Sequence, residues 1–454
     1  MVEKNKTYNI EIEDIGSSGE GVGKIDGFTV FVPQAIPGDR VKVKITTLKK
    51  RYGIGKIIEI TQTSRDRVKP ICNLFGKCGG CQLMHMAYQA QLDMKRNKVV
   101  QALNRIGKID AKVHPTIGME NPYGYRNKAQ FPVGIRNGKA IIGPYEMGSH
   151  NIVDTNYCHI QAPITEKITE IIKKYIDDYK IEVYDEVKRR GLIRNIIIRV
   201  GFATGDVMVV LVTNGRQLPY KDELIKMLKE NIPGLKSVVQ NINTRNTNVV
   251  LGEETIVLYG EDRIVDHIGE SKFNISSKSF FQVNSIQTKI LYDKVLEYAD
   301  LKGNEVVFDI YCGIGTIALY LAQEAKEVHG VEIIDAAIED ARVTAKINNI
   351  NNAKFYVGDA EKVVPNLYKE GLYADIVVVD PPRRGCEESV LETMVKMAPE
   401  KIIYVSCNPA TLARDLGYLV EKGYKVVEVQ PVDMFPQTVH VEVVTLLIRN
   451  EVSK

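Results

Sequence analysis

The chain has 454 residues, of which 44% are hydrophobic and 26% are charged, and its formal net charge is +3 at neutral pH. This composition is typical of a folded globular protein and excludes a disordered or fibrous one, while the length favours two to four domains. The sequence holds no run of about 18 apolar residues and no apolar stretch after its charged N-terminus. We therefore expect no membrane span and no secretory signal, and a cytoplasmic location.

Residues 1–60 are predicted to form a small β-barrel. Glycines separate short apolar runs such as Phe28–Val32, and a Pro-Gly-Asp turn stands at Pro37–Asp39. Arg40 to Ile45 alternate strictly between basic and apolar residues, as a half-buried strand does. From Arg40 to Ile58 there are seven basic residues and no acidic one. Such a face suits the phosphates of a nucleic-acid backbone, although a merely solvated strand face explains the charge equally well.

Residues 61–285 are predicted to form a mixed α+β central domain. A helical pattern rich in Gln, Lys and Arg covers residues 86–106, and apolar runs at Ile193–Val200 and Val207–Val212 indicate strands. We expect the segment from about residue 84 to residue 115 to pack with the C-terminal domain.

The seven cysteines fall into distinct groups. Cys72, Cys78 and Cys81 lie within ten residues of one another, Cys158 follows at a distance, and the other three lie in the C-terminal third. An odd number of cysteines in a chain without a secretory signal argues against a disulfide framework and favours metal binding or catalysis. Chemistry alone leaves zinc and iron–sulfur as alternatives for the first four, because thiolates bind either.

Residues 286–454 are predicted to form a parallel sheet covered by helices on both faces. Apolar runs alternate with helix-compatible stretches, and near-continuous apolar strands are typical of such a sheet. The expected strands are Val306–Ile310, Val328–Val331, Lys354–Val357, Ile376–Val379, Ile402–Val405 and Tyr424–Val429, with Val439–Ile448 closing an antiparallel hairpin at the edge. Ligands of such sheets bind beyond the carboxyl ends of the strands.

The first three strand ends suggest a cofactor site. Residues 308–316 are Phe-Asp-Ile-Tyr-Cys-Gly-Ile-Gly-Thr, in which Gly313 and Gly315 permit a tight turn and close backbone approach to a ligand. Glu332 ends the second strand, where a carboxylate binds ribose hydroxyls. Asp359 ends the third, where it suits an adenine amino group. A dinucleotide site is the alternative, because the glycines also fit the looser NAD fingerprint.

The fourth and fifth strands end in residues suited to catalysis. Residues 380–385 are Asp-Pro-Pro-Arg-Arg-Gly, so the carboxylate of Asp380 stands on a stiff backbone; an ordinary capped turn is the alternative. Arg383 occupies the place of the aromatic residue that serves adenine amino-group methylation. Pro409 suits the first turn of a helix, which puts Cys407 just before a helix N-terminus, where the thiolate is favoured. A small buried cysteine is the alternative interpretation.

One reaction needs these parts together. Alternation places His440 and Glu442 on one face of the last strand. Carbon 5 of uracil attacks the sulfonium methyl of S-adenosylmethionine only after a thiolate has added to carbon 6, and the carbon 5 proton must then be removed. The reaction therefore needs a nucleophile, a proton acceptor and an acceptor for the ring N3–H, which Cys407, Glu442 and Asp380 would supply in turn.

The sequence resembles the RNA (uracil-5-)-methyltransferases that act on 23S ribosomal RNA and on the tRNA T-loop. The resemblance is carried by residues 308–316, by Asp-Pro-Pro-Arg at 380–383, by Ser-Cys-Asn-Pro at 406–409, by Phe-Pro-x-Thr-x-His-Val-Glu at 435–442 and by Ser-Phe-Phe-Gln-Val-Asn at 279–284. It implies a Rossmann-like class I methyltransferase domain. The implied cofactor contacts are Gln282, Tyr311, Gly313, Gly315, Glu332, Asp359 and Asp380.

The resemblance also assigns the N-terminal regions. Cys72, Cys78, Cys81 and Cys158 resemble the ligands of a [4Fe-4S] cluster in members of this family, and residues 1–60 resemble the OB-like TRAM module thought to bind RNA. The tRNA-specific branch generally lacks both, so the resemblance implies 23S ribosomal RNA as the partner. We expect a monomer with no DNA partner, and we assign no role to Cys312 or Cys386.

Three alternatives stay open at this point. The tRNA T-loop is the alternative substrate, and a non-catalytic RNA-binding or ribosome-assembly protein is the alternative class. A cytosine-5 methyltransferase is disfavoured, because RNA enzymes of that kind usually carry a second cysteine directly after the proline of the fourth-strand motif, where this chain has Arg383.

Overall fold

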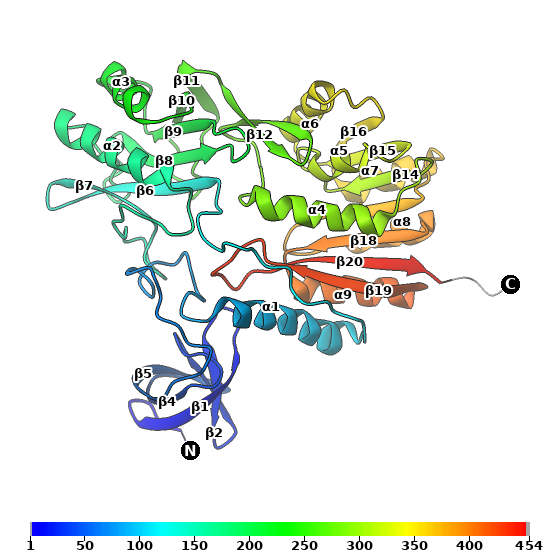
Figure 1. The fold of residues 1–454 in the computed structure, drawn as a ribbon, viewed down its shortest axis with the longest axis horizontal. Helices are drawn as coiled ribbons and strands as arrows, with labels where there is room; N and C mark the ends of the chain where they lie inside the picture. Colours follow the sequence, from blue (N-terminus) through cyan, green and yellow to red (C-terminus); the bar gives the residue numbers. More distant parts are fainter. Residues whose placement is uncertain (1, 451–454) are drawn as a thin grey trace.

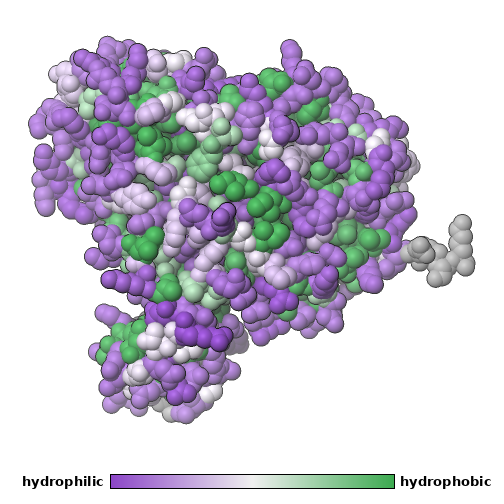
Figure 2. Space-filling view, viewed as in Figure 1, coloured by the Kyte–Doolittle hydropathy of each residue, from purple (hydrophilic) through white to green (hydrophobic). Residues whose placement is uncertain are grey.

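The computed structural model describes residues 2–450, which form a barrel, a central domain and a C-terminal domain (Figure 1). The barrel (blue) lies at one end of the molecule, and the central domain (cyan and green) and the C-terminal domain (yellow to red) lie side by side beyond it. Among the described residues, no helix is long and apolar enough to cross a membrane. Hydrophilic residues cover most of the face shown in Figure 2, and the apolar ones form separate groups.

Five strands close the N-terminal barrel in the order β1-β2-β3-β5-β4. Their bounds are β1 Thr7–Ile15, β2 Gly21–Ile25, β3 Phe28–Val32, β4 Arg40–Leu48 and β5 Tyr52–Gln62. The predicted alternation in β4 is confirmed: Val41, Val43 and Ile45 are fully buried, and the basic residues between them are exposed. The predicted turn before β4 ends at Asp39, whose buried carboxylate binds the guanidinium of Arg67 and fixes the end of the barrel.

A six-stranded sheet in the order β11-β10-β9-β8-β6-β7 forms the core of the central domain. Its strands are β6 Lys128–Arg136, β7 Lys139–Ile142, β8 Ile193–Val200, β9 Val207–Thr213, β10 Leu235–Ile242 and β11 Glu254–Gly260. The helices α2 (Ile164–Tyr179) and α3 (Lys221–Asn231) cover one face. The hairpin of β12 (Arg263–Ile268) and β13 (Ser271–Ser276) packs between the other face and the C-terminal domain, in one continuous core.

The C-terminal domain is built on a seven-stranded sheet in the order β16-β15-β14-β17-β18-β20-β19. Its strands are β14 Val306–Ile310, β15 Glu327–Glu332, β16 Ala353–Val357, β17 Ile376–Val379, β18 Lys401–Ser406, β19 Tyr424–Val432 and β20 Glu442–Arg449. The first five are parallel, and β20 and β19 form the predicted antiparallel hairpin at the edge. The expected parallel sheet is therefore confirmed.

Helices cover both faces of this sheet because successive strand residues face opposite sides. In β14, Val307 packs toward one group of helices and Phe308 toward the other. The first group is α4 Ser285–Ala299, α5 Thr316–Leu321 and α6 Asp335–Ile347. The second group is α7 Ala360–Lys369, α8 Glu388–Met397 and α9 Pro409–Glu421. Both faces are apolar, which explains the near-continuous hydrophobic strands in the sequence.

The chain crosses onto the C-terminal sheet before it enters the central domain. Helix α1 (Tyr88–Ala102) continues into a π-helical turn, η1 (Leu103–Gly107). Val99 and Leu103 are buried in the same core as Leu412 of α9, and α1 lies along the β19 edge of the sheet (Figure 1). Helix α1 therefore packs as part of the C-terminal domain although it precedes the central domain in sequence.

The last strand begins later than predicted. The expectation was a strand from Val439, but residues 433–441 form a loop and β20 begins at Glu442. The carbonyls of this loop bind donors outside the sheet instead of a neighbouring strand. The expected strand alternation therefore does not apply to His440, which is exposed, whereas Glu442 is buried.

Candidate active site

Five of the predicted site residues lie at one edge of the C-terminal sheet. Tyr311 follows β14, Glu332 is the last residue of β15, Asp359 follows β16, Asp380 follows β17 and Cys407 follows β18. Since these strands are parallel, their carboxyl ends meet at the same edge. The order of the strands reverses between β14 and β17, which is where ligands bind in open α/β sheets.

Cys407, Glu442 and Asp380 converge at this edge. Ser406 is paired with Val443 in the antiparallel ladder, so the next position along β18, Cys407, lies opposite Glu442. Asp380 follows the strand on the other side of β18. Burial raises the pKa of Asp380 to about 6, and burial together with the charge of Asp380 raises the pKa of Glu442 well above its usual range. Two carboxylates in one buried site with little access to solvent repel each other, so both resist ionisation.

The turn that carries Cys407 is tied to the turn that carries Asp380. Asn408 is the N-cap of α9, where its Oδ1 accepts the backbone N–H of Ala410 at 3.1 Å. Its amide nitrogen donates to the carbonyl of Arg383 at 2.9 Å. Cys407 therefore stands directly before a capped helix, as predicted from Pro409. The Asp-Pro-Pro-Arg turn is held against it by this hydrogen bond from the cap.

The expectation that this position favours the thiolate is wrong for the free enzyme. The pKa of Cys407 is raised to about 11, first by burial and then by the carboxylates of Glu442 and Asp380. The guanidinium of Arg383 acts in the opposite direction but does not compensate for them. A helix N-terminus acts over only its first turn, and here burial and two nearby acids act against it.

The loop after β14 has an open backbone. Gly313 has a φ of 55° and no atom within 4 Å of the place where a Cβ would stand, so a ligand can approach its backbone. Gly315, with a φ of 75°, caps α5 against Ala341 and Phe355. Tyr311 adopts the left-handed region with a φ of 69°, which is uncommon outside glycine and typical of functional turns.

Glu332 holds the loop in place and keeps capacity for a ligand. Its two carboxylate oxygens accept the backbone N–H groups of Gly313 at 3.1 Å and Ile334 at 3.0 Å. Each oxygen has a second lone pair for a ribose hydroxyl. Ile333 and Ile334 are 60% and 59% exposed directly beyond this carboxylate. Exposed apolar side chains directly after Glu332 fit an adenine ring, so the edge suits S-adenosylmethionine.

Gln282, the remaining predicted cofactor residue, comes from another segment. It lies just before α4, and its carbonyl accepts the side-chain amide of Asn127 at 2.9 Å. This bond joins the start of the central sheet to the segment that precedes the C-terminal domain. Thr316, at the start of α5, is engaged with the hydroxyl of Tyr292 at 2.7 Å.

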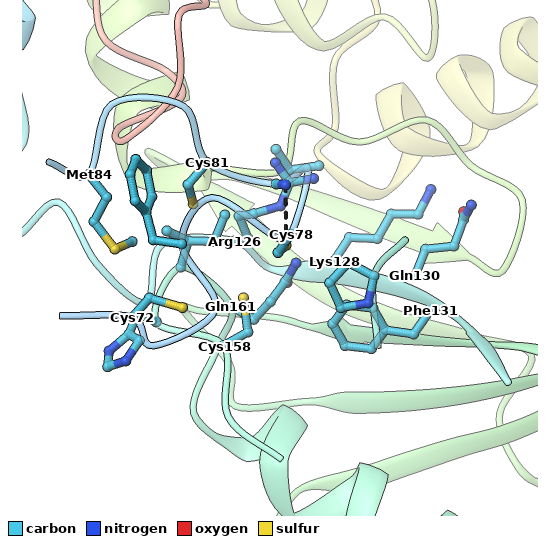
Figure 3. A pocket seen from close by; sticks show the side chains of 16 residues that line it. Cys72, Cys78, Cys81, Met84, Arg126, Lys128, Gln130, Phe131, Cys158 and Gln161 are labelled. Atoms are coloured by element: carbon cyan, nitrogen blue, oxygen red, sulfur yellow. Dashed lines mark hydrogen bonds between the residues drawn. The ribbon is translucent and has the colours of Figure 1, made fainter. Parts of the chain in front are cut away.

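The four other predicted cysteines line a single cavity of about 390 Å³ (Figure 3). Three of them come from the loop that follows the barrel, and Cys158 comes from a turn of the central domain. Burial and the neighbouring thiols raise the pKa values of Cys78, Cys81 and Cys158. The Sγ of Cys78 accepts the N–H of Gly80 at 3.3 Å. Folding thus brings Cys158, which is distant in sequence, to the same cavity as the other three cysteines.

This cavity differs from a single-ion metal site. In residues 2–450, no three or more His, Cys, Asp or Glu side chains converge on one point that suits a metal ion. Structural zinc requires such convergence of four ligands, whereas each thiolate of a [4Fe-4S] cluster binds a different iron atom. Arg126 and Lys128 also line the cavity and suit a group of negative charge. Four thiols are a donor set that zinc and an iron–sulfur cluster can both use.

Sequence reasoning missed a set of polar residues on α1. Tyr88, Gln91, Lys95 and Lys98 recur at spacings of three and four and reach the loop before Glu442. Lys95 is fully buried, which is rare for lysine. The only signal in the sequence was the polar character of residues 86–106, and it is equally typical of a solvated helix.

The sheet, the cofactor edge and the barrel define a class I methyltransferase with an RNA-binding module. The profile of the tRNA (uracil-5-)-methyltransferase family matches residues 87–450, and that of the TRAM domain matches residues 2–58. The chain therefore belongs to the tRNA (uracil-5-)-methyltransferase family. It is an RNA (uracil-5-)-methyltransferase that depends on S-adenosylmethionine.

Relatives match over nearly the whole chain. An RNA methyltransferase of Clostridium tetani is 55% identical over 98% of this chain and 97% of its own length, and one of Clostridium acetobutylicum is 53% identical over 99% and 98%. Among solved structures, the Pyrococcus abyssi tRNA (uracil-54, C5)-methyltransferase in complex with S-adenosyl-L-homocysteine is 29% identical. It covers 97% of this chain and 100% of its own, with a TM-score of 0.77.

Proposed function

We propose that this enzyme methylates carbon 5 of a uridine in 23S ribosomal RNA through a covalent bond between Cys407 and carbon 6 of the base. The observation that carries the proposal is the convergence of Cys407, Glu442 and Asp380 at the cofactor edge of the sheet. A thiol alone is common in proteins, but a thiol between two buried carboxyl groups matches the needs of this reaction.

Each residue performs one step. The Cys407 thiolate adds to carbon 6, and the electron pair of the ring double bond moves to carbon 5 and the ring carbonyl as an enolate. S-adenosylmethionine supplies the methyl group as a sulfonium when it is bound. Glu442 then takes the carbon 5 proton, the sulfur–carbon 6 bond breaks, and the thiolate returns. Asp380 accepts the ring N3–H and orients the base throughout.

The proton acceptor needs a carboxylate, and its raised pKa suits the task. A base with a pKa near the working pH takes a proton from carbon more readily than an ordinary carboxylate does. The pKa of Glu442 is raised above that of an ordinary carboxylate, because burial and the charge of Asp380 both favour its protonated form.

The cofactor is assigned to the edge that begins at Tyr311. Glu332 would bind the ribose hydroxyls, Asp359 the adenine amino group and Gln282 the amino-acid part of the cofactor. Gly313 and Gly315 keep the loop backbone close to the cofactor. This assignment is supported by the open backbone at Gly313 and by the exposed apolar residues after Glu332.

We further propose that Cys72, Cys78, Cys81 and Cys158 hold a [4Fe-4S] cluster. Support comes from the cavity that the four cysteines share and from the cationic residues that line it. Such a cluster would join the loop after the barrel to the central domain at one place.

The transfer RNA T-loop is the second candidate substrate. The Pyrococcus abyssi enzyme acts on uracil 54 of tRNA and aligns with 97% of this chain, so an architecture of this extent also serves a tRNA enzyme. Ribosomal RNA is supported by the basic face of the barrel and by the resemblance of the four cysteines to those of enzymes acting on 23S ribosomal RNA.

We also propose that the enzyme is a cytoplasmic monomer without a DNA partner.

Methylation of unmodified transcripts distinguishes the two substrates. Full-length 23S ribosomal RNA and a set of tRNA transcripts would be incubated separately with the enzyme and S-adenosylmethionine, and 5-methyluridine located by mass spectrometry of nuclease fragments. We expect 5-methyluridine in the ribosomal transcript only. Methylation of the tRNA T-loop alone would contradict the ribosomal assignment. A Cys407→Ala variant, which should be inactive on both but still bind RNA, is the control.

A further inference from the structure

The loop from Asp433 to Val441, which we call the base loop, carries Glu442 at its end. Its carbonyls are held one after another by donors from outside the C-terminal sheet. Side chains donate to five of these carbonyls: Gln287 to that of Asp433, Asn284 to that of Met434, Lys95 to that of Phe435, Tyr125 to that of Pro436 and Lys98 to that of Val439. The carbonyl of Gln437 accepts the backbone N–H groups of Gln82 and Leu83. The base loop is therefore held by donors from several other segments of the chain.

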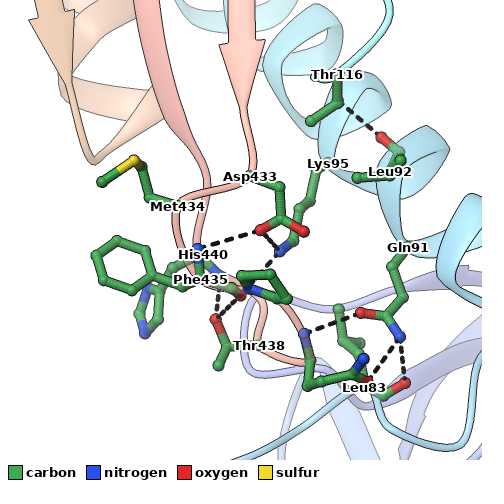
Figure 4. A network of polar contacts seen from close by, with 12 residues as sticks. Leu83, Gln91, Leu92, Lys95, Thr116, Asp433, Met434, Phe435, Thr438 and His440 are labelled. Atoms are coloured by element: carbon green, nitrogen blue, oxygen red, sulfur yellow. Dashed lines mark hydrogen bonds and ion pairs between the residues drawn. The ribbon is translucent and has the colours of Figure 1, made fainter. Parts of the chain in front are cut away.

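Helix α1 contacts the base loop through polar side chains on one of its faces (Figure 4). Tyr88, Gln91, Lys95 and Lys98 lie at spacings of three and four, so their side chains point the same way. Each of the four makes a hydrogen bond to the base loop. Gln89, which lies between Tyr88 and Gln91 in sequence, is exposed on another side of the helix.

A buried ion pair anchors the start of the base loop. The ammonium of Lys95 donates to the carboxylate of Asp433 at 2.5 Å and to the carbonyl of Phe435 at 3.1 Å, and both charged side chains are fully buried. The hydroxyl of Tyr88 donates to the other oxygen of Asp433 at 2.9 Å. Both charged groups thus have hydrogen-bond partners, as a buried charge requires.

A second anchor fixes the middle of the base loop. The Oε1 of Gln91 accepts the backbone N–H of Gln437 at 3.1 Å, and its Nε2 donates to the Gln437 side chain at 3.0 Å. Gln437 adopts a φ of 68°, a conformation that non-glycine residues rarely take without support. The carbonyl of Gln437 also accepts the N–H groups of Gln82 and Leu83, directly after Cys81.

From these contacts we infer that the polar face of α1 positions Glu442 for proton abstraction, with Gln91, Lys95 and Lys98 as positioning residues. The inference rests on the proposed role of Glu442. No helix or strand lies between Gln437 and Glu442, so the anchored loop leads directly into the proton acceptor. Misplacement of a catalytic group by about 1 Å costs up to about 100-fold in rate, so a loosened base loop is enough to slow the reaction.

A loosened base loop would leave a distinctive signature. Addition of Cys407 to carbon 6 and transfer of the methyl group precede proton abstraction, and neither uses Glu442. If only the proton acceptor is misplaced, the methylated RNA stays bonded to Cys407, because the sulfur–carbon bond breaks only when the carbon 5 proton leaves. A general loss of fold would instead slow adduct formation and release together.

The test compares Gln91→Ala, Lys98→Met and Glu442→Gln with Gln89→Ala, the matched control on the exposed side of α1. Each full-length variant is incubated with S-adenosylmethionine and an unmodified 23S ribosomal RNA transcript. The readouts are free methylated RNA and covalent RNA–protein complex on denaturing gels. Lys98 is partly exposed, so its replacement tests the base loop if Gln91→Ala folds poorly.

For Gln91→Ala and Lys98→Met we expect turnover to fall about tenfold or more while the covalent complex accumulates. The Gln89→Ala variant should behave as wild type. The inference is overturned if both variants turn over normally, or if adduct formation falls in step with turnover. Glu442→Gln tests the role of Glu442 separately. If this variant releases methylated RNA normally, the proposed role of Glu442 is wrong. If it accumulates the covalent complex while Gln91→Ala and Lys98→Met do not, only the positioning role of α1 is wrong.

Discussion

Cys407 lies among charges that work against its ionisation. Burial and two carboxyl groups raise its pKa to about 11, and Arg383 is the charged neighbour that lowers it. The sequence predicts this cysteine before a helix N-terminus, and that location is right. Its ionisation was not predictable, because the neighbours that decide it come from β17 and β20, at distances along the chain that no local pattern reports.

The rate of adduct formation should therefore depend strongly on pH. Below the pKa of a thiol, the thiolate fraction rises up to about tenfold per pH unit, so trapping by RNA that contains 5-fluorouridine should accelerate between about pH 6 and pH 9. Replacing Arg383 by Met should slow trapping at every pH in this range, because the cation lowers the pKa of Cys407. Quench-flow trapping at saturating RNA measures both effects, with Arg384→Met as the control; a rate independent of pH would contradict them.

Glu442 should reduce the stability of the protein as the pH rises. Its pKa is raised in the folded state, so its favourable contribution is complete below its unfolded pKa and is lost as the pH rises toward the folded pKa. Glu442→Gln cannot ionise and escapes this loss. The melting temperature of the variant minus that of wild type should therefore be larger at about pH 8 than at about pH 5, as measured by thermal unfolding. If the melting temperatures of variant and wild type differ by the same amount at both pH values, the pKa of Glu442 is not raised.

At the scale of elements, the strands of the C-terminal sheet were predictable and the base loop was not. The bounds of β14 and β17 agree with the apolar runs because both faces of these strands are buried. The start of β20 was misplaced by three residues, since Val439 and Val441 continue an apolar alternation that the backbone does not follow. The polar donors of α1 and α4 hold this segment, and such long-range partners leave no periodic signal.

The buried pair of Lys95 and Asp433 should show strong coupling. Removing one partner leaves a buried charge alone, which typically costs about 3–5 kcal/mol. Lys95→Met should therefore lower the urea midpoint of unfolding markedly. Combining it with Asp433→Asn removes the orphaned charge and keeps an acceptor oxygen for the backbone N–H of Phe435, so most of the loss should be recovered. If the double variant is as unstable as the single one, the pair is not the source of the effect.

At the scale of the whole molecule, the barrel contacts the segments that lead to the four-cysteine cavity and to the catalytic edge. Gly19 stands in the turn between β1 and β2, and a Cβ at this position would lie within 3.0 Å of Gln82 and Val439. The barrel therefore packs closely against the base loop and against the loop that carries Cys72, Cys78 and Cys81. The order of the domains could be derived from sequence patterns. Their mutual contacts could not, because each depends on a few residues that meet only after folding.

The basic face of the barrel should contribute to RNA affinity through phosphates. Lys42 and Lys44 are exposed on β4, on the side away from the barrel core. Replacing both by Ala should weaken RNA binding, and the slope of log affinity against log salt should fall by about 0.7–0.9 for each phosphate that the protein no longer neutralises. Filter binding at several salt concentrations measures the slope, and the barrel core is unaffected by these changes. An unchanged slope would show that RNA binds elsewhere.

The four cysteines should bind iron and sulfide as a set. Enzyme purified without oxygen should contain iron and acid-labile sulfide in equal amounts and absorb broadly in the visible range. Cys81→Ser should lose most of both, whereas Cys386→Ser, which changes a buried cysteine of the C-terminal domain, should retain them. Zinc in place of iron in the wild-type protein would contradict the cluster.

The most direct test of the central claim is covalent trapping on 23S ribosomal RNA that contains 5-fluorouridine, in the presence of S-adenosylmethionine. Fluorine at carbon 5 cannot leave as a proton does, so the reaction stops with RNA bonded to the enzyme. We expect a stable complex whose peptide map places the modified uridine on Cys407, and no complex for Cys407→Ala. A complex at another residue, or normal turnover by Cys407→Ala on unmodified RNA, would contradict it.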